Sequence, residues 1–157
     1  MTKLLVLSDS HGVTGTMRSA VERQQPDYIV HLGDYERDAK WLTAVFPDLP
    51  LISLPGNCDR PMPNVIQTKL LDFEGVKIFM THGHLYDVKH GLLKLELAGR
   101  EAGANIVLFG HTHQQLCVEK DGLWLLNPGS CGEWFPSCGL VSLQNGSAQC
   151  SLLDLSN

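Results

Sequence analysis

The stretch Tyr28-Ile29-Val30-His31-Leu32-Gly33-Asp34 places an aspartate directly after a short apolar run. The run is too short for a helix, so it predicts a buried strand that delivers Asp34 to its carboxyl end. His31 lies inside the run, where a hydrogen-bonded core histidine is the expected interpretation. Taken alone, Asp34 could equally be the N-cap of a following helix. The rest of the chain has to decide between the two.

Four more apolar runs end in residues that can ligate a metal ion. These runs cover 3–7, 51–54, 76–80 and 106–109. The residues that follow them are Asp9 and His11, Asn57, His82, and His111 and His113. In open α/β sheets ligands gather beyond the carboxyl ends of the strands, so residues over a hundred positions apart can converge. The five strand ends therefore predict one shared site, which includes Asp34.

Helical and hairpin patterns surround these strands. Apolar residues at helical spacing predict helices over 15–25, 39–46 and 92–102. Two-residue turns predict hairpins at Glu74-Gly75, Asp121-Gly122 and Asn145-Gly146, which join strands over 65–73 and 76–80, 117–119 and 123–126, and 140–143 and 148–155. Helices in the first two thirds and hairpins at the end indicate two sheets packed face to face, with helices covering the outside.

The composition bounds the class of protein. With 157 residues, 43% of them hydrophobic and 18% charged, we expect a single globular domain over 1–157. A formal net charge of -5 provides no basic surface for nucleic acid, so we expect no nucleic-acid partner. The amino terminus has too few apolar residues for a signal peptide or a membrane span, and we expect a cytoplasmic protein without membrane contact. Five cysteines, an odd number without a Cys-x-x-Cys pair, argue against a disulfide framework or a zinc finger.

The residue types in the shared site favour a particular group of metals. Imidazoles, carboxylates and one amide oxygen, with no thiolate required, suit Mn, Fe, Zn or Co at five- to six-coordination better than structural zinc. Each piece alone has an ordinary alternative, because an Asp-x-His or His-x-His loop is often surface chemistry and Asn57 after a glycine is a typical turn residue. The combination favours metal binding, because five strands end in such residues and the set contains four of the seven histidines.

Five blocks, in chain order, resemble those of the calcineurin-like metallophosphoesterases. The blocks are Asp9-Ser10-His11, Gly33-Asp34, Gly56-Asn57-Cys58-Asp59, His82-Gly83 and Gly110-His111-Thr112-His113. The short chain, and the later Asn127-Pro128-Gly129-Ser130, are similar to the small bacterial and archaeal YfcE-like phosphodiesterase branch. The resemblance implies a four-layer αββα sandwich, in which two packed mixed β-sheets are flanked by helices, and a dinuclear metal centre.

The resemblance also implies an assignment of ligands and a mechanism. One ion would take Asp9, His11, Asp34 and His113, and the other Asp34, Asn57, His82 and His111. Asp34 would then be the shared ligand. We expect two divalent ions, with Mn before Fe, Zn, Ni or Co. Two such ions about 3.5–4 Å apart can clamp a phosphoryl group and lower the pKa of a bound water toward 7. The expected reaction is attack of this hydroxide on the phosphorus of a phosphodiester.

One departure from the family pattern concerns protonation of the leaving group. Many relatives have a histidine after the block asparagine, and this chain has Cys58. A thiol with a pKa of about 8.5 is a poorer substitute for imidazolium, and Cys58 could instead be a small residue packed beside the metals. His84 could take over as proton donor or phosphate contact, or it could be a solvent-facing loop histidine. The candidate catalytic residues are thus Asn57, Cys58 and His84.

Several residues and functions stay open at this point. Asp59 could orient a ligand histidine or cap the following loop, and Arg60 could pair with a substrate phosphate or simply be exposed. Trp134 and Phe135 could line a substrate pocket or a subunit contact. The apolar carboxyl-terminal hairpin with Cys138 and Cys150 could be core or an interface in a homo-oligomer.

The expected partner is a small phosphate ester, and two other functions remain. The same centre could serve a phosphomonoesterase or nucleotide phosphatase. A catalytically weak protein-binding scaffold resembling the retromer scaffolding subunit is the alternative from a different class. The complete ligand set argues against this last alternative.

Overall fold

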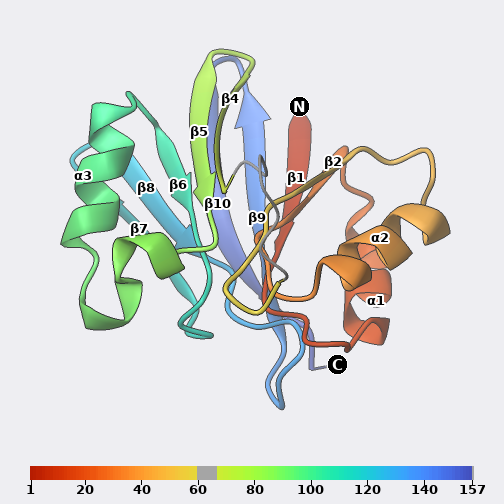
Figure 1. Ribbon diagram of the computed structural model, residues 1–157. Coiled ribbons are helices and arrows are strands. Elements are labelled where there is room, and N and C mark those ends of the chain that lie inside the picture. The colour runs from red at the N-terminus through yellow and green to blue at the C-terminus, as the bar shows by residue number, and fades with distance from the viewer. Residues whose placement is uncertain (60–66, 157) are drawn as a thin grey trace.

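Two five-stranded mixed sheets pack face to face in the computed structural model, which describes residues 1–59 and 67–156 (Figure 1). The first sheet contains, in spatial order, β10 (Ser147–Asp154), β9 (Ser137–Gln144), β1 (Thr2–Leu7), β2 (Tyr28–His31) and β3 (Leu51–Ser53). The second contains β4 (Thr68–Phe73), β5 (Val76–Thr81), β6 (Ile106–Leu108), β8 (Leu123–Asn127) and β7 (Leu116–Lys120). The helices are α1 (Gly15–Gln24), α2 (Glu36–Val45) and α3 (Leu93–Glu101), with short 3-10 turns η1 (His84–Tyr86) and η2 (Val88–His90).

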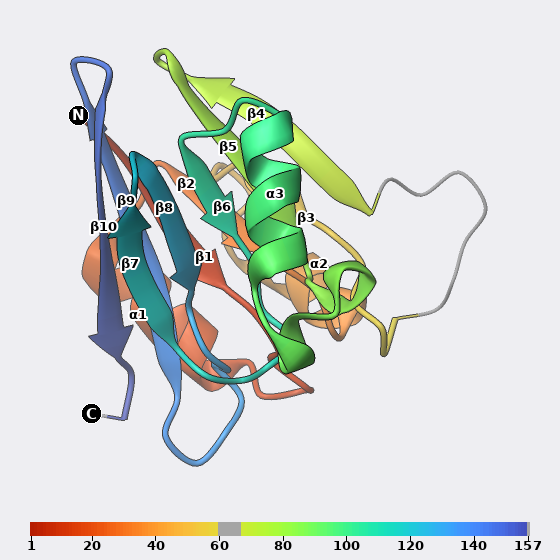
Figure 2. The same cartoon turned by 90° about the vertical axis from the view of Figure 1, so that its left-hand side faces the viewer.

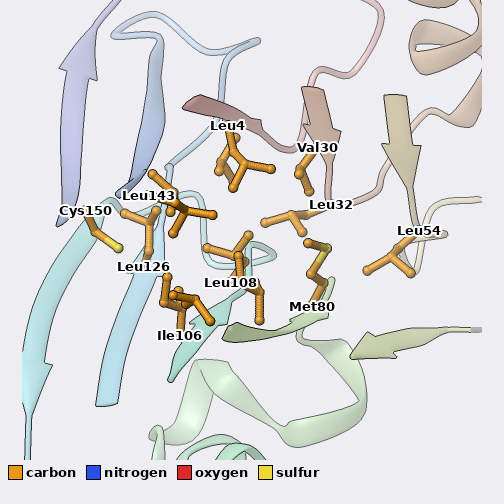
Figure 3. Packing of buried hydrophobic residues seen from close by; sticks show 14 residues of the cluster. Leu4, Val30, Leu32, Leu54, Met80, Ile106, Leu108, Leu126, Leu143 and Cys150 are labelled. Atoms are coloured by element: carbon orange, nitrogen blue, oxygen red, sulfur yellow. The ribbon is translucent and has the colours of Figure 1, made fainter. Parts of the chain in front are cut away.

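The helices cover the outer faces of both sheets. Figures 1 and 2 show α1 and α2 beside the first sheet and α3 beside the second. Strand β1 explains the layering. Leu4 packs into the core between the sheets (Figure 3), and Val6 belongs to the same cluster, whereas Leu5 and Leu7 pack with residues of α1 and α2. A strand that is apolar on both faces has to be covered on both. The four-layer sandwich implied by the family resemblance is therefore confirmed.

The direction of the strands brings their carboxyl ends together. In the first sheet β1, β2 and β3 run parallel, and in the second β5, β6 and β8 do. The remaining strands are added by the three predicted hairpins. Both residues of each two-residue turn have positive φ, for example 55° at Glu74 and 88° at Gly75, which is the geometry of a type I′ turn. The chain segments that follow the parallel strands lie at one edge of the sandwich.

Some element boundaries differ from those predicted. Helix α2 begins at Glu36 instead of residue 39, because the Glu36 N–H donates to Asp59 Oδ1 from a distant loop. Strand β9 begins at Ser137, three residues before the predicted start. The strand predicted over 65–73 is described only from Thr68 onward, and residues 65 and 66, like Arg60, lie outside the described residues.

The core histidine and the cysteines also have clear positions. His31 is fully buried and lies 3.0 Å from Ser10 Oγ, as expected of a hydrogen-bonded core histidine. All five cysteines are free, and Cys138 and Cys150 are buried within the chain. Among the described residues, no helix has both the length and the apolar character needed to cross a membrane.

Candidate metal centre

In Asp9 and in Asp34, one carboxylate oxygen accepts hydrogen bonds from neighbouring residues and the other faces a common pocket. Asp9 Oδ2 accepts hydrogen bonds from Ser8 Oγ at 2.6 Å and from the His111 N–H at 3.1 Å, while its buried Oδ1 has no hydrogen-bond partner among the described residues. Asp34 Oδ1 accepts from the Cys58 N–H at 2.8 Å, and its Oδ2 faces imidazoles. A buried carboxylate oxygen without a donor is costly unless a cation occupies the space beside it.

Two histidines complete one half of the pocket. His11 Nε2 lies 3.5 Å from Asp34 Oδ2 and 3.8 Å from Asp9 Oδ1, and His113 Nε2 lies 3.2 Å from Asp9 Oδ1. Like Asp9 Oδ1, the buried His11 Nε2 has no hydrogen-bond partner among residues 1–59 and 67–156. The ligand atoms of Asp9, His11, Asp34 and His113 all lie within 4.8 Å of one another. A single divalent ion would satisfy these atoms together, so the residues fit a metal.

The other half of the pocket comes from His82, Asn57 and His111. His82 Nε2 lies 3.5 Å from Asp34 Oδ2 and 3.0 Å from Asn57 Oδ1. The rings of His82 and His111 are 5.1 Å apart between centroids. His82 Nδ1 donates to the Leu32 carbonyl at 2.8 Å, which leaves the lone pair on Nε2 for a ligand. Asp34 thus lies between two groups of imidazoles.

The charge on Asp34 is stabilised by its neighbours. Burial raises the pKa of this carboxyl group, but the adjacent His82 ring, with Nε2 3.5 Å from Asp34 Oδ2, and the hydrogen bond from the Cys58 N–H outweigh burial and hold the pKa well below its usual range. Asp34 is therefore an ionised carboxylate at neutral pH, which is the form that binds a cation.

The ligand residues are divided between the two sheets. Loops after β1, β2 and β3 carry Asp9 and His11, Asp34, and Asn57, whereas loops after β5 and β6 carry His82, His111 and His113. The Gly110 N–H donates to the His82 carbonyl at 2.8 Å, and the Asp9 N–H to the Gly33 carbonyl at 3.0 Å. Hydrogen bonds of this kind join neighbouring loops, so the pocket forms at the edge where both sheets end.

Five of the candidate ligands adopt the left-handed backbone conformation. The φ angles are 56° at Asp9, 46° at His11, 57° at Asp34, 70° at His111 and 61° at His113. Residues other than glycine reach this region at a cost of about 1–3 kcal/mol each, and such residues cluster at functional sites. These five residues follow strands β1, β2 and β6, whereas Asn57 and His82 are not in this conformation.

Close backbone packing explains the glycines of the motifs. A Cβ atom on Gly33 would lie 2.6 Å from the Gly56 nitrogen, and one on Gly56 would lie 2.2 Å from Asp34 Oδ1. A Cβ on Gly110 would lie 2.8 Å from Asp9 Oδ2. Each of these glycines therefore makes room for a neighbouring loop or for a ligand carboxylate.

A buried network supports the loop that carries His11. Ser10 Oγ and the Gly12 N–H both donate to Asp38 Oδ2 at 2.7 Å. Since Ser10 Oγ donates to Asp38, it accepts from His31 Nε2, whose other ring nitrogen accepts from the Gly33 N–H. Burial lowers the pKa of His31 to about 4, despite the nearby charge of Asp38, so the ring is neutral. Asp38 was not among the residues singled out from the sequence, because it has no motif of its own.

Glu133 is a second residue that the sequence did not indicate. Its Oε1 atom accepts a hydrogen bond from His113 Nδ1, which leaves Nε2 of the same ring facing Asp9. Carboxylates that hold a ligand histidine in this way fix its tautomer and orientation. Glu133 lies twenty positions after His113, in a loop between β8 and β9 without a ligand motif, so only the folded chain reveals the pairing.

Glu133→Gln is expected to lower metal affinity about 10- to 100-fold, since loss of a partner of a ligand histidine typically has this effect. Glutamine retains a hydrogen-bond acceptor but removes the charge that polarises the imidazole. The measurement is a titration of metal into the stripped protein, with Glu119→Gln, an exposed glutamate on β7, as the matched control. Unchanged metal affinity in Glu133→Gln would contradict this role.

The remaining predicted residues have the following positions. Cys58 is exposed, and partial desolvation together with the charge of Asp34 raises the pKa of its thiol, which is therefore protonated at neutral pH. The ring of His84 lies 5.5 Å from that of His82, and burial lowers its pKa. Asp59 accepts from the N–H groups of Glu36, in α2, and of Gly56, three positions earlier, whereas the loop that follows Asp59 lies outside the described residues.

The segment that carries Glu133 lies beside the pocket and has an apolar tip. Ser130 Oγ donates to the Asp9 carbonyl at 2.7 Å, so the turn from Asn127 onward contacts the loop of a candidate ligand. Trp134 and Phe135 are 90% and 81% exposed. Neither ring is covered by the described part of the chain to a substantial extent.

Comparison with protein families and curated proteins gives consistent results. Residues 2–146 match the model of the calcineurin-like phosphoesterase superfamily domain. The chain is 34% identical over 131 residues to the probable metallophosphoesterase YsnB of Bacillus subtilis, an alignment that covers 81% of this chain and 73% of YsnB. It is 26% identical over 163 residues to the phosphodiesterase MJ0936 of Methanocaldococcus jannaschii, and this alignment covers 90% of this chain and 93% of MJ0936.

Solved structures share the fold. A predicted phosphoesterase from Streptococcus pneumoniae superposes with a TM-score of 0.79 at 24% identity, and the alignment covers 98% of this chain and 90% of that one. Vps29 from Entamoeba histolytica, solved in complex with zinc, superposes with a TM-score of 0.77 at 20% identity. The alignment covers 98% of this chain and 99% of the Vps29 chain. At these identities the likeness concerns the fold alone.

Proposed function

The chain belongs to the calcineurin-like phosphoesterase superfamily, and we propose that it hydrolyses phosphodiesters at a centre of two divalent metal ions. The membership confirms the family indicated by the five motif blocks. The observation that carries the proposal is the pair of inward carboxylate oxygens, Asp9 Oδ1 and Asp34 Oδ2, each within 4 Å of histidine nitrogens. The preference for a diester is supported by the relative MJ0936, which is named a phosphodiesterase.

The proposed ligands fall into two sets that share Asp34. One ion would be held by Asp9, His11, Asp34 and His113, and the second by Asp34, Asn57, His82 and His111. When bound, divalent ions act as Lewis acids on a phosphoryl group and activate water at neutral pH. Mn²⁺ is the ion that we propose for assays, with Fe, Zn, Ni and Co as alternatives that suit the same nitrogen and oxygen ligands.

The chain itself supplies orientation and charge. The Leu32 carbonyl and Glu133 fix the tautomers of His82 and His113, so their Nε2 atoms face the pocket. Two aspartate ligands would balance only part of the charge of two divalent ions, so the loaded centre would stay cationic and attract a phosphate anion within an acidic protein. The proposed role of His84, whose ring lies 5.5 Å from that of His82 and 6.1 Å from that of His111, is to contact the phosphate or to donate a proton.

Cys58→His is expected to increase the hydrolysis of diesters with poor leaving groups. The Cys58 thiol keeps its proton at neutral pH and forms only weak hydrogen bonds, whereas an imidazolium would protonate a leaving alkoxide. The measurement compares kcat for an alkyl diester and for a nitrophenyl diester, with Cys58→Ser as the control. Unchanged or lower rates on the alkyl diester would be the result that contradicts this prediction.

A protein-binding scaffold is the second candidate. The observation that favours it is the exposed pair Trp134 and Phe135, in the segment whose Glu133 contacts His113, together with the likeness in fold to Vps29. In such a protein the centre would serve as a structural element next to a contact surface. A phosphomonoesterase with the same centre is the alternative within the enzyme class.

One assay separates these functions. The purified protein is stripped of metal, restored with Mn, Zn, Fe, Ni or Mg, and tested on aryl phosphate monoesters and diesters, with Asp34→Asn as the inactive reference. Metal-dependent turnover with higher kcat/KM on the diester supports the proposal. Preference for the monoester would assign a phosphomonoesterase, and turnover no higher than that of Asp34→Asn with every ion would favour the scaffold.

A further inference from the structure

We propose that Arg37, held over the ring of Tyr35, binds a second phosphate group of the substrate, next to the phosphodiester that is cleaved. The substrate class is thus a phosphodiester that also carries a phosphomonoester group, as in a dinucleotide with a terminal phosphate. This inference rests on the proposed function and adds to it the chemistry that selects the substrate.

An open pocket lies directly beside the candidate metal centre. It has a volume of about 370 Å³ and is lined by Tyr35, Glu36, Arg37, Cys58 and Asp59. This volume is within the range of small-molecule sites. Two of the lining residues directly follow candidate ligands in the sequence, because Tyr35 follows Asp34 and Cys58 follows Asn57. A molecule bound at the metal centre can therefore extend into this pocket.

The guanidinium of Arg37 is held in a defined place. Its Cζ atom lies 4.9 Å from the centroid of the Tyr35 ring, within the range of a cation–π contact. The Tyr35 ring is in turn 5.1 Å from the ring of His11 between centroids. Nη2 of Arg37 lies 3.5 Å from the position that a Cβ on Gly12 would take, so the side chain reaches the loop that carries His11.

Arg37 retains its capacity to bind an anion. Within residues 1–59 and 67–156 it forms no ion pair, whereas the acidic groups of the pocket are engaged. Both oxygens of Asp59 accept backbone N–H groups, and Glu36 lies 3.9 Å from Lys40 Nζ. A planar guanidinium with several donors suits a phosphate, which it can bind in a bidentate manner.

The position of Arg37 favours a second phosphate over the one that is cleaved. The reacting phosphate would bind to the ions that the converging side chains of Asp9, His11, Asp34 and His113 are proposed to hold. The guanidinium contacts the Tyr35 ring, which lies 5.1 Å from the His11 ring between centroids, and His11 Nε2 lies 3.5 Å from Asp34 Oδ2. Arg37 would therefore contact a group attached to the reacting phosphate. A second anionic group would complement the positive charge of the guanidinium.

The test compares dithymidine monophosphate with the same dinucleotide carrying a terminal phosphate at its 5′ or its 3′ end. Wild-type protein loaded with Mn²⁺ is expected to show a lower KM for a phosphorylated dinucleotide. Arg37→Ala should raise that KM about tenfold, as expected for a charge-assisted hydrogen bond in an open pocket. The kcat and the KM of the unphosphorylated dinucleotide should stay unchanged, and Arg37→Lys should restore part of the difference.

A binding measurement separates this inference from the proposed function. Calorimetry compares thymidine 3′,5′-bisphosphate with thymidine 5′-monophosphate on the Mn²⁺-loaded wild type, on Arg37→Ala and on Arg23→Ala, an exposed arginine in the last turn of α1. Loss of the preference for the bisphosphate in Arg37→Ala, but not in Arg23→Ala, supports the inference. Failure to cleave either dinucleotide would count only against the proposed function. A preference that is absent from the wild type, or that Arg37→Ala retains, would overturn it.

Discussion

Asp34→Asn is expected to prevent binding of both proposed metal ions and to reduce phosphodiester hydrolysis by more than about 100-fold. Loss of a residue that only supports a ligand histidine costs about 10- to 100-fold, so loss of a ligand itself should cost more. Asp34 Oδ2 lies 3.5 Å from His11 Nε2 and 3.5 Å from His82 Nε2, which belong to the two proposed ligand sets. An asparagine keeps the shape of the side chain but removes the negative charge that would hold two cations close together in the proposed centre. Both sites should therefore weaken in parallel.

Asp9→Asn is the matched comparison. Asp9 Oδ1 is closest to His113 Nε2, at 3.2 Å, and in the proposed assignment it belongs to one ligand set only. We expect this variant to lose mainly one ion. The measurement is the number of metal ions per chain after dialysis, together with kcat/KM on an aryl diester. Equal losses of both ions from the two variants would show that Asp34 is not the bridge.

Gly56→Ala is expected to abolish metal binding at Asp34 with the addition of only one methyl group. The new Cβ would lie 2.2 Å from Asp34 Oδ1 and 2.5 Å from the Asp34 nitrogen, which is backbone and cannot rotate away. The loop that carries Asp34 has to shift, and the Cys58 N–H then no longer meets Asp34 Oδ1. We expect a loss of hydrolysis similar to that of Asp34→Asn, and a decrease of about 1–3 kcal/mol in the free energy of unfolding.

Gly15→Ala is the control for this substitution. A Cβ on Gly15 meets no heavy atom within 4 Å among the described residues, and this glycine begins helix α1. It should therefore leave metal content and activity unchanged. Denaturant unfolding and metal analysis on both variants give the comparison. Full metal occupancy in Gly56→Ala would mean that the loops at the sheet edge are softer than their packing indicates.

The order of strands and helices could be predicted because each element carries its own signal. Apolar runs such as that of β1 are buried on both faces, and this pattern is visible in the sequence. The turns at Glu74-Gly75 and Asn145-Gly146 require positive φ, which their residue types favour. The beginning of α2 could not be predicted, because its first N–H is bound by Asp59 from another loop.

The candidate site could also be predicted only in part. Its ligand-type residues could be recognised because they follow strand ends, and the structure brings these side chains together. The supporting residues Asp38 and Glu133 could not, since their partners are defined only by the packing of distant loops. The left-handed conformation of Asp9 and His111 has no signal either, because neither residue is a glycine.

The division of the candidate ligands between two sheets has a consequence for the order of assembly. Residues before position 60 supply Asp9, His11, Asp34 and Asn57, and residues after position 80 supply the rest, so neither part of the chain offers the whole set. An ion can be enclosed only after the sheets have docked. A bound ion would then link the two sheets. It would stabilise the native state by mass action and slow unfolding, but it would not accelerate the earlier steps of folding.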